Sequence, residues 1–353
     1  MEEFHFSNTD LATLVVSIYV LGFAIGPLII APLSEINGRR LVYLISNFFF
    51  LLFTIGCALS SNLGMLFAFR FLAGCAGSTP VTLGGASIGD MFPKESRGAA
   101  MAVWGMGPIL GPVLGPVIGG FLAQGKGWRW TFWLQAIVSG TTLLLGTAFL
   151  RETYAVTILE HKTQRLIRET GDRDLVSALR DGTPGKEHFK RAFIRPVKML
   201  LLSPIVLLLS LYMALIFGYL YLFLTTFPTV FQEQYGFSTG VTGLSYLGVG
   251  IGSFVGLVIA GKSSDPLYVR LTAKNHGVGH PEFRLPPLMF TCPLIVIAFF
   301  WYGWSVETKT HWIVPIIGTS LFGMGMIPAF VSSLFPRVSS SILESRTISR
   351  FID

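Results

Sequence analysis

Residues 11–33 read LATLVVSIYVLGFAIGPLIIAPL, a run of 23 residues that contains no charged side chain. A helix needs about 20 apolar residues to cross roughly 30 Å of hydrocarbon, so this run is long enough to span a membrane. Strands of a membrane barrel would be about ten residues long and would alternate in polarity, which this run does not. The stretch therefore predicts a transmembrane helix.

Eight further runs of similar length follow along the chain. Only one of the nine contains a charge, Arg70. The nine runs are 11–33, 41–61, 62–89, 98–124, 130–150, 199–232, 236–261, 285–306 and 312–336. They predict an all-α integral membrane protein of nine spans.

The composition of the 353 residues supports the same interpretation. Charged residues make up 13% of the chain and apolar residues 52%, whereas soluble domains carry about 25% charged residues. The mean hydropathy is +0.63. These values exclude a soluble globule and a disordered chain. The three cysteines lie in apolar runs and predict buried thiols rather than a disulfide set or a metal site.

Positive charges divide unequally between alternate loops. If the loop at 32–40 lies inside, the inside loops up to Arg284 hold 19 Lys and Arg, and the outside connections hold three, Lys126, Arg129 and Lys309. Cytoplasmic loops carry such an excess. The net charge of +7 is thus an orientation signal, and the expected partner is the lipid bilayer, not nucleic acid.

One long polar segment divides the chain. We expect an N-terminal helix bundle over 1–150, a cytoplasmic central loop with short amphipathic helices over 151–198, a C-terminal bundle over 199–336 and a polar tail over 337–353. A shift of 230 positions places Gly22 on Gly252, Gly26 on Gly256 and Glu35 on Asp265. Weak internal repeats of this kind are typical of transporters. Chance similarity between two glycine-rich spans is the alternative.

The loop at 31–40 reads APLSEINGRR and lies at the predicted inner face. An acid, a glycine and two arginines in a short loop can latch neighbouring helix ends and release them, as a transporter gate does. A plain positive-inside anchor is the alternative. Asp90 and Arg97 flank the next inside loop and can join this cluster, or they can be ordinary solvated charges. The predicted cytoplasmic gate comprises Ser34, Glu35, Gly38, Arg39, Arg40, Asp90, Arg97 and Asp265.

Arg70 is a charge inside a predicted span, which is costly and marks function by default. Gly74 and Gly77 follow at i+4 and i+7 on the same helical face. Small residues mark helix contacts, so Arg70 is predicted to face the bundle. There it can hold a substrate anion or tune a protonatable partner. The alternative is an arginine that snorkels to the outer interface.

The span at 98–124 repeats glycine and proline every four residues. Such spacing predicts a glycine stripe against a neighbouring helix, and the prolines remove three backbone donors and favour bending. A purely structural packing helix is the alternative. The stripe and its prolines are Gly107, Pro108, Gly111, Pro112, Gly115, Pro116, Gly119 and Gly120.

Aromatic residues are dense in 199–232, at Tyr212, Phe217, Tyr219, Tyr221, Phe223 and Phe227. They can line a site for large apolar or cationic ligands, but ordinary lipid-facing residues are the favoured interpretation. No metalloprotease pattern is present in the sequence, and the matches to the nucleophile-elbow spacing at 85–89 and to the phosphate-loop spacing at 256–263 fall in or at the end of predicted membrane spans, not in a strand–turn–helix context. The sequence therefore predicts no enzyme, no cofactor and no metal.

Taken together, these motifs resemble the major facilitator superfamily, and specifically the fungal branch of twelve-span drug:proton antiporters. The resemblance covers about residues 4–330. Residues 31–40 resemble the family's loop between its second and third helices, and Arg70 to Gly77 resembles the fourth-helix motif. The segment with Gly111, Gly115, Pro116, Gly119 and Gly120 resembles the antiporter motif of the fifth helix, and 281–286 and 301–304 resemble the fungal subgroup.

The resemblance implies a 6+6 helix fold, alternating access and proton-driven export of small organic compounds such as drugs, polyamines or metabolites. It implies that Arg70 takes part in proton coupling and that Glu35, Arg39, Asp90 and Arg97 form the inward-face gate. We expect a monomer in the plasma membrane. The sequence matches spans two to ten of twelve, so the other expectation is an inactive or truncated membrane protein that does not transport.

Overall fold

The computed structural model describes residues 9–93, 97–172, 174–179, 194, 198–275 and 286–330. Helices account for the regular structure of these residues, and none of them forms a strand. Eight helices are long and apolar enough to cross a membrane, and a shorter apolar helix at Thr291–Glu307 corresponds to the remaining predicted span. The prediction of an all-α integral membrane protein is confirmed.

The chain divides into two compact units. The first comprises residues 1–108 with 125–198, and the second comprises residues 109–124 with 199–353. Helices of the first unit are α1 (Thr9–Asn37), α2 (Arg39–Ala58), α3 (Leu63–Gly77), α4 (Thr79–Met91), α6 (Arg129–Phe149) and α7 (Ala155–Thr170). Helix α5 (Arg97–Lys126) contributes residues to both units.

The second unit contains five labelled elements and one further helix. They are α9 (Pro204–Pro228), the π-helix η2 (Thr229–Gln234), α10 (Thr239–Ser245), α11 (Leu247–Lys274), α12 (Pro286–Glu307) and the helix Ile313–Phe330. Three predicted spans each contain two consecutive helical elements, and the span at 199–232 contains α9 followed by η2. The span at 62–89 is α3 followed by α4, and the span at 236–261 is α10 followed by α11.

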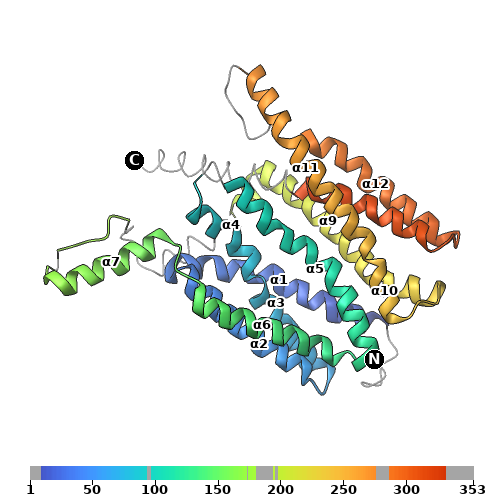
Figure 1. Cartoon of the computed structure of the whole chain (residues 1–353), viewed down its shortest axis with the longest axis horizontal. Coiled ribbons are helices and arrows are strands. Elements are labelled where there is room, and N and C mark those ends of the chain that lie inside the picture. Colours follow the sequence, from blue (N-terminus) through green and yellow to red (C-terminus); the bar gives the residue numbers. More distant parts are fainter. Residues whose placement is uncertain are drawn as a thin grey trace. The chain divides into compact units, whose positions relative to one another are not determined.

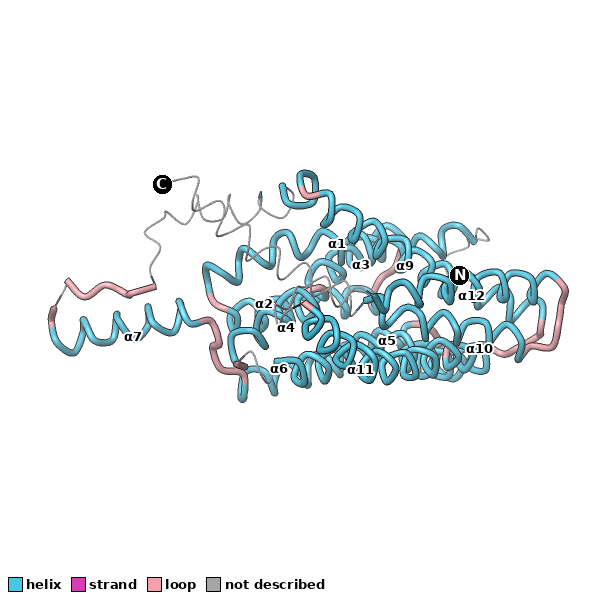
Figure 2. Tube along the Cα trace, turned by 90° about the horizontal axis from the view of Figure 1, so that it is seen from above, coloured by secondary structure: helices cyan, strands magenta, loops and turns pink. Residues whose placement is uncertain are grey.

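Helices of the first unit pack in pairs. In Figures 1 and 2, α2 runs alongside α6, and α7 lies beyond the ends of the other helices of this unit. Helix α1 approaches α3 so closely that a Cβ on Gly22 would meet the carbonyl oxygen of Phe71. A Cβ on Gly74 would in turn meet the carbonyl oxygen of Tyr19. Only glycine permits this backbone approach, which is typical of membrane helix pairs.

The second unit repeats this contact. A Cβ on Gly252 would meet the carbonyl oxygen of Ser320, and one on Gly323 would meet that of Val249. Gly252 is the residue that the 230-position shift pairs with Gly22, and Val249 is the residue that it pairs with Tyr19. The repeated sequence pattern therefore corresponds to a repeated helix contact.

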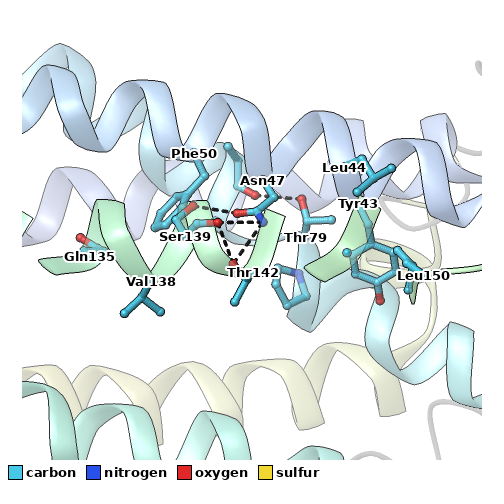
Figure 3. Close-up of a pocket in the computed structure, with 14 residues that line it drawn as sticks. Tyr43, Leu44, Asn47, Phe50, Thr79, Gln135, Val138, Ser139, Thr142 and Leu150 are labelled. Carbon is cyan, nitrogen blue, oxygen red and sulfur yellow. Dashed lines mark hydrogen bonds between the residues drawn. The ribbon is translucent and has the colours of Figure 1, made fainter. Parts of the chain in front are cut away.

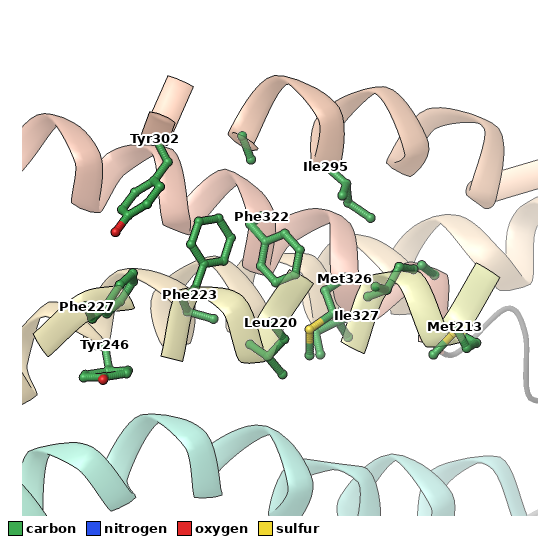
Figure 4. Packing of buried hydrophobic residues seen from close by; sticks show 14 of the residues in the cluster. Met213, Leu220, Phe223, Phe227, Tyr246, Ile295, Tyr302, Phe322, Met326 and Ile327 are labelled. Carbon is green, nitrogen blue, oxygen red and sulfur yellow. The ribbon is translucent and has the colours of Figure 1, made fainter. Parts of the chain in front are cut away.

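An aromatic core holds the second unit together (Figure 4). Phe223 and Phe227 of α9 have no exposed surface, and Phe223 stacks on Phe299 with ring centroids 4.5 Å apart. The lipid-facing interpretation is therefore wrong for these two residues, because they lie on the inward face of α9. Phe217 and Tyr219 of the same helix are 37% and 40% exposed, so the lipid-facing interpretation agrees with the structure for these two.

Candidate functional site

A partly buried ion pair lies where helices of the first unit end, on the side that the charge distribution predicts to be the inner one; we call it and its neighbours the inner cluster. Arg39 begins α2 and Asp90 lies in the last turn of α4, and the Arg39 Nε donates to Asp90 Oδ2 at 3.3 Å. The guanidinium also donates to the hydroxyl of Ser34, at the end of α1. Arg39 is only 8% exposed. The structure thus joins the ends of α1, α2 and α4 through one arginine, with Asp90 in contact with the cluster, which was one of the two alternatives that the sequence left open.

Tyr154 covers the other side of this arginine. The guanidinium carbon of Arg39 lies 4.9 Å from the centroid of the Tyr154 ring, a cation–π distance. Burial raises the pKa of Tyr154, and the negative charge of Glu35 adds to the increase. Glu35 itself is exposed. The inner cluster therefore extends from the predicted loop to the segment that follows α6.

Glu152 is part of this cluster, although its sequence position gave no reason to place it there. Its carboxylate accepts hydrogen bonds from the backbone amides of Arg39 at 2.9 Å and Arg40 at 3.1 Å. It also accepts from the amides of Thr153 at 3.0 Å and Tyr154 at 2.9 Å. The available signal was a carboxylate two residues after Leu150, the last apolar residue of a span, at a face otherwise rich in positive charge.

The remaining predicted gate residues have different surroundings. Gly38 has a φ of +86°, a conformation that favours glycine. Arg40 is exposed and donates to the carbonyl of Thr147 at 3.3 Å. The side chains of Arg97 and Asp265 lie outside the described part of the structure.

Arg70 lies inside the first unit, at the middle of α3. Its Nε donates to the carbonyl oxygen of Val15 on α1 at 3.3 Å. The guanidinium lies 5.1 Å from the ring centroid of Tyr19 and 5.3 Å from that of Phe132 on α6. Among the described side chains, no carboxylate pairs with it. Arg70 therefore faces the helix bundle, as the glycine spacing predicted, and is solvated by two aromatic rings and one carbonyl.

The two glycines that follow Arg70 are both close to α1. Gly74 forms the backbone contact with Tyr19 already described, and a Cβ on Gly77 would lie 2.8 Å from the Tyr19 hydroxyl. The same tyrosine presents its ring to Arg70. Glycine at these positions lets α1 carry Tyr19 to the arginine.

Among the described residues of its own unit, the glycine stripe of α5 does not make the close contact that its spacing predicted. Within its own unit, no atom lies within 4 Å of a Cβ built on Gly111, Gly115 or Gly119. The close approach uses another face of the helix, where the carbonyl of Pro116 lies 2.5 Å from a Cβ built on Gly243. The glycines that allow this close approach lie on the partner helices, at Gly243 of α10 and Gly250 of α11, and not on α5.

Gly120 is the exception within the stripe, because it does face α10. A Cβ built on it would lie 2.9 Å from the carbonyl of Thr239. Gln124, one turn further along α5, accepts a hydrogen bond from the amide of Gly240 at 2.8 Å. The C-terminal part of α5 therefore packs on the start of α10 through Gly120 and Gln124.

A groove of about 480 Å³ lies in the first unit between α2, the α3–α4 junction and α6 (Figure 3). Its walls are mainly apolar and include Gly77. Three polar side chains in it bond to one another: Ser139 Oγ donates to Asn47 Oδ1 at 2.8 Å, and Asn47 Nδ2 donates to Thr142 Oγ1 at 3.2 Å. The groove has the size and lining of a small organic ligand site, but these polar groups also tie α2 to α6.

Replacing Asn47 with leucine is expected to weaken the α2–α6 contact. Hydrogen bonds between membrane helices contribute about 0.6 kcal/mol each, so loss of the three bonds that Asn47 makes to Ser139 and Thr142 lowers the free energy of unfolding by about 2 kcal/mol. Thermal unfolding of the purified protein in detergent measures this change. Thr225→Val is the matched control, since the Thr225 hydroxyl bonds only to carbonyls of its own helix. An unchanged melting temperature for Asn47→Leu would contradict the prediction.

Apolar helices in two units, a repeated glycine contact, a bundle-facing arginine and a charged cluster at the helix ends define a polytopic membrane transporter. The chain belongs to the Major Facilitator Superfamily, whose family model matches residues 1–347. Its relatives are named as transporters or efflux pumps, so the chain is a transporter and not an enzyme.

Two fungal relatives illustrate the similarity. The chain is 49% identical over 356 residues to the MFS-type transporter penM of Penicillium rubens, covering 99% of this chain and 70% of that protein. It is 44% identical over 359 residues to the efflux pump radE of Floropilus chiversii, covering 100% of this chain and 67% of that protein.

Solved structures share the fold. The proton:xylose symporter XylE superposes with a TM-score of 0.65 at 18% identity, covering 94% of this chain and 73% of that chain. The human organic anion transporter MFSD10 gives a TM-score of 0.58 at 20% identity, covering 91% and 69%. At these identities the likeness establishes the helix arrangement alone.

Proposed function

We propose that this protein exports small organic compounds from the cytoplasm by alternating access, with protons moving in the opposite direction. Export is supported by a relative at 44% identity that is named as an efflux pump. We further propose that it acts as a monomer in the plasma membrane with residues 151–198 in the cytoplasm, since that segment holds eleven of the positive charges. Drugs, polyamines and metabolites are the substrate classes to test.

The environment of Arg70 is the observation that carries the coupling proposal. A guanidinium within a span is costly, and here it lies between two rings and a single carbonyl oxygen. An arginine held in this way can attract an anionic group of the substrate or lower the pKa of an acid that comes near it. Either event would link substrate movement to a proton.

The inner cluster supplies the gate of this mechanism. Arg39 joins α1, α2 and α4 through Ser34 and Asp90. Separating these helix ends would break a charge-assisted bond, so the cluster would favour the access state in which the ends of this unit lie together. To change the access state, binding of substrate and protons then needs to supply only the difference in free energy between the two access states.

Substrate-dependent proton flux in inside-out vesicles tests the function. With an inwardly acidic gradient, addition of a transported compound is expected to dissipate the gradient, and the gradient is expected to drive accumulation of that compound. Vesicles without the protein provide the baseline. Absence of both effects across organic cations, polyamines and neutral aromatic compounds would refute export by proton antiport.

Replacing Asp90 with asparagine is expected to lower the transport rate about tenfold. Hydrogen bonds to charged groups contribute about 1.5–3 kcal/mol, and 1.4 kcal/mol changes an equilibrium constant tenfold. The gate would then stay open for a larger part of the cycle. Initial rates of uptake into vesicles measure the effect, and Asp172→Asn, in the polar segment after α7, is the control. A wild-type rate for Asp90→Asn would exclude this ion pair from the gate.

A further inference from the structure

The N-terminus of α2 has no cap of its own. Its first residue is Arg39, and the residue before it, Gly38, has no side chain to accept from the helix amides. The first amides of a helix lack intrahelical partners and attract negative charge. Here the acceptor comes from 113 positions away, because Glu152 bonds to the amides of Arg39 and Arg40.

The surroundings of Glu152 are shaped around its carboxylate. A Cβ built on Gly38 would lie 2.5 Å from Oε2 of Glu152, so a larger residue there would displace the carboxylate. The amides of Thr153 and Tyr154 turn back onto Oε1, the oxygen that also accepts from Arg39. Burial alone would raise the pKa of Glu152, but the four amides together hold it below its ordinary value.

This carboxylate fixes the backbone from which the gate arginine extends. The amide of Arg39 bonds to Glu152, while its guanidinium bonds to Asp90 and lies over the ring of Tyr154. Tyr154 follows Glu152 by two residues, and α7 begins at the next residue. The segment between α6 and α7 is therefore attached to the gate at both its backbone and its side chains.

We propose that Glu152 is a positioning residue of the cytoplasmic gate: by capping α2, it holds Arg39 within reach of Asp90 and couples the start of the central loop to gate closure. The inference rests on the proposed gating function of the Arg39–Asp90 pair. Glu152 touches neither substrate nor proton path; it acts through Arg39. Movement of the central loop would reach the gate through this contact.

A double-mutant cycle tests the proposal. Glu152→Gln, Asp90→Asn and the double variant are compared by the rate at which a membrane-impermeant thiol reagent labels Ser87→Cys from the cytoplasmic side. Ser87 is 7% exposed and lies one turn before Asp90, so its labelling reports opening of the inner end of α4. The background variant replaces Cys57, Cys75 and Cys292 with alanine.

Each single substitution is expected to raise the labelling rate about tenfold, and the double variant is expected to label no faster than the single ones. Glu169→Gln is the matched control, because it removes an exposed carboxylate that pairs with Arg165 of its own helix at 2.7 Å. It is expected to label like the background. Glu152→Asp, which retains the charge at shorter reach, is expected to be intermediate and serves if Glu152→Gln does not fold.

Two outcomes would overturn the proposal. Unchanged labelling for both Glu152 variants would show that the cap does not hold the gate. Additive increases in the double variant would show that Glu152 acts on the fold without passing through Arg39 and Asp90. Because labelling needs no substrate, failure of the proton-flux assay would refute the proposed transport without deciding the role of Glu152.

Discussion

Replacement of Arg70 by alanine is expected to abolish coupled transport while leaving folded protein in the membrane. The substitution removes a desolvated charge whose described partners are one carbonyl and two rings, so no buried carboxylate is left unpaired. Loss of a group that positions or tunes a proton transfer lowers rates by about 10²–10⁴-fold. We therefore expect a fall of at least about a hundredfold in substrate-dependent proton flux.

Arg70→Lys distinguishes the contribution of charge from that of shape. Lysine keeps the positive charge but loses the planar group that lies beside Tyr19 and Phe132, so partial activity is expected. Arg165→Ala, on the exposed face of α7, is the control for loss of an arginine. Wild-type flux in Arg70→Ala would remove this residue from the mechanism.

Substrate exchange without a proton gradient separates the two roles open to Arg70. If the arginine binds an anionic part of the substrate, the half-saturation concentration for exchange is expected to rise in Arg70→Ala. If it tunes an acid, exchange is expected to persist while the proton gradient no longer drives accumulation. The two roles thus predict opposite results in one assay.

Asp90 could be suggested as a neighbour of Arg39 because both residues border short inside loops, and alternate loops of a helix bundle meet at the same membrane face. The same pattern left an ordinary solvated charge equally open for Asp90. The sequence could not predict Glu152 at the start of α2, since that contact depends on how α6 ends beside α2. Burial of Phe223 and Phe227 was missed for a related reason. A helix that is apolar on all faces gives no periodic signal to distinguish lipid from protein.

The glycines also show that spacing in the sequence does not decide which helix contacts form. Four-residue spacing predicted close contacts for Gly111 and Gly115 in α5, whereas Gly22 and Gly26 in α1 were noted only for the internal repeat. In the structure the α1 glycines meet the backbone of α3, whereas the α5 glycines meet nothing in their own unit. A small-residue stripe shows that a helix permits close approach, but only the partner helix decides whether it occurs.

Leucine at Gly74 is therefore expected to prevent formation of the folded protein. The obstacle to its Cβ is the carbonyl of Tyr19 and the amide of Phe23, which are backbone atoms and cannot rotate away. Overpacking of a well-packed contact costs about 1–3 kcal/mol, and displacement of a backbone costs more. We expect no monodisperse peak after solubilisation in mild detergent. A folded Gly74→Leu variant with a wild-type melting temperature would refute the close contact between α1 and α3.

The repeat extends this prediction to Gly323, which meets the carbonyl of Val249 and the amide of Ser253. These are the residues that the 230-position shift pairs with Tyr19 and Phe23, so Gly323→Leu is expected to fail in the same way. Gly303→Leu is the control, because no atom lies within 4 Å of a Cβ at Gly303. Equal loss at the two repeated sites with none at the control would identify the glycine contact as the element that each unit needs to fold. Loss at only one site would mean that the units share a pattern but not its energetics.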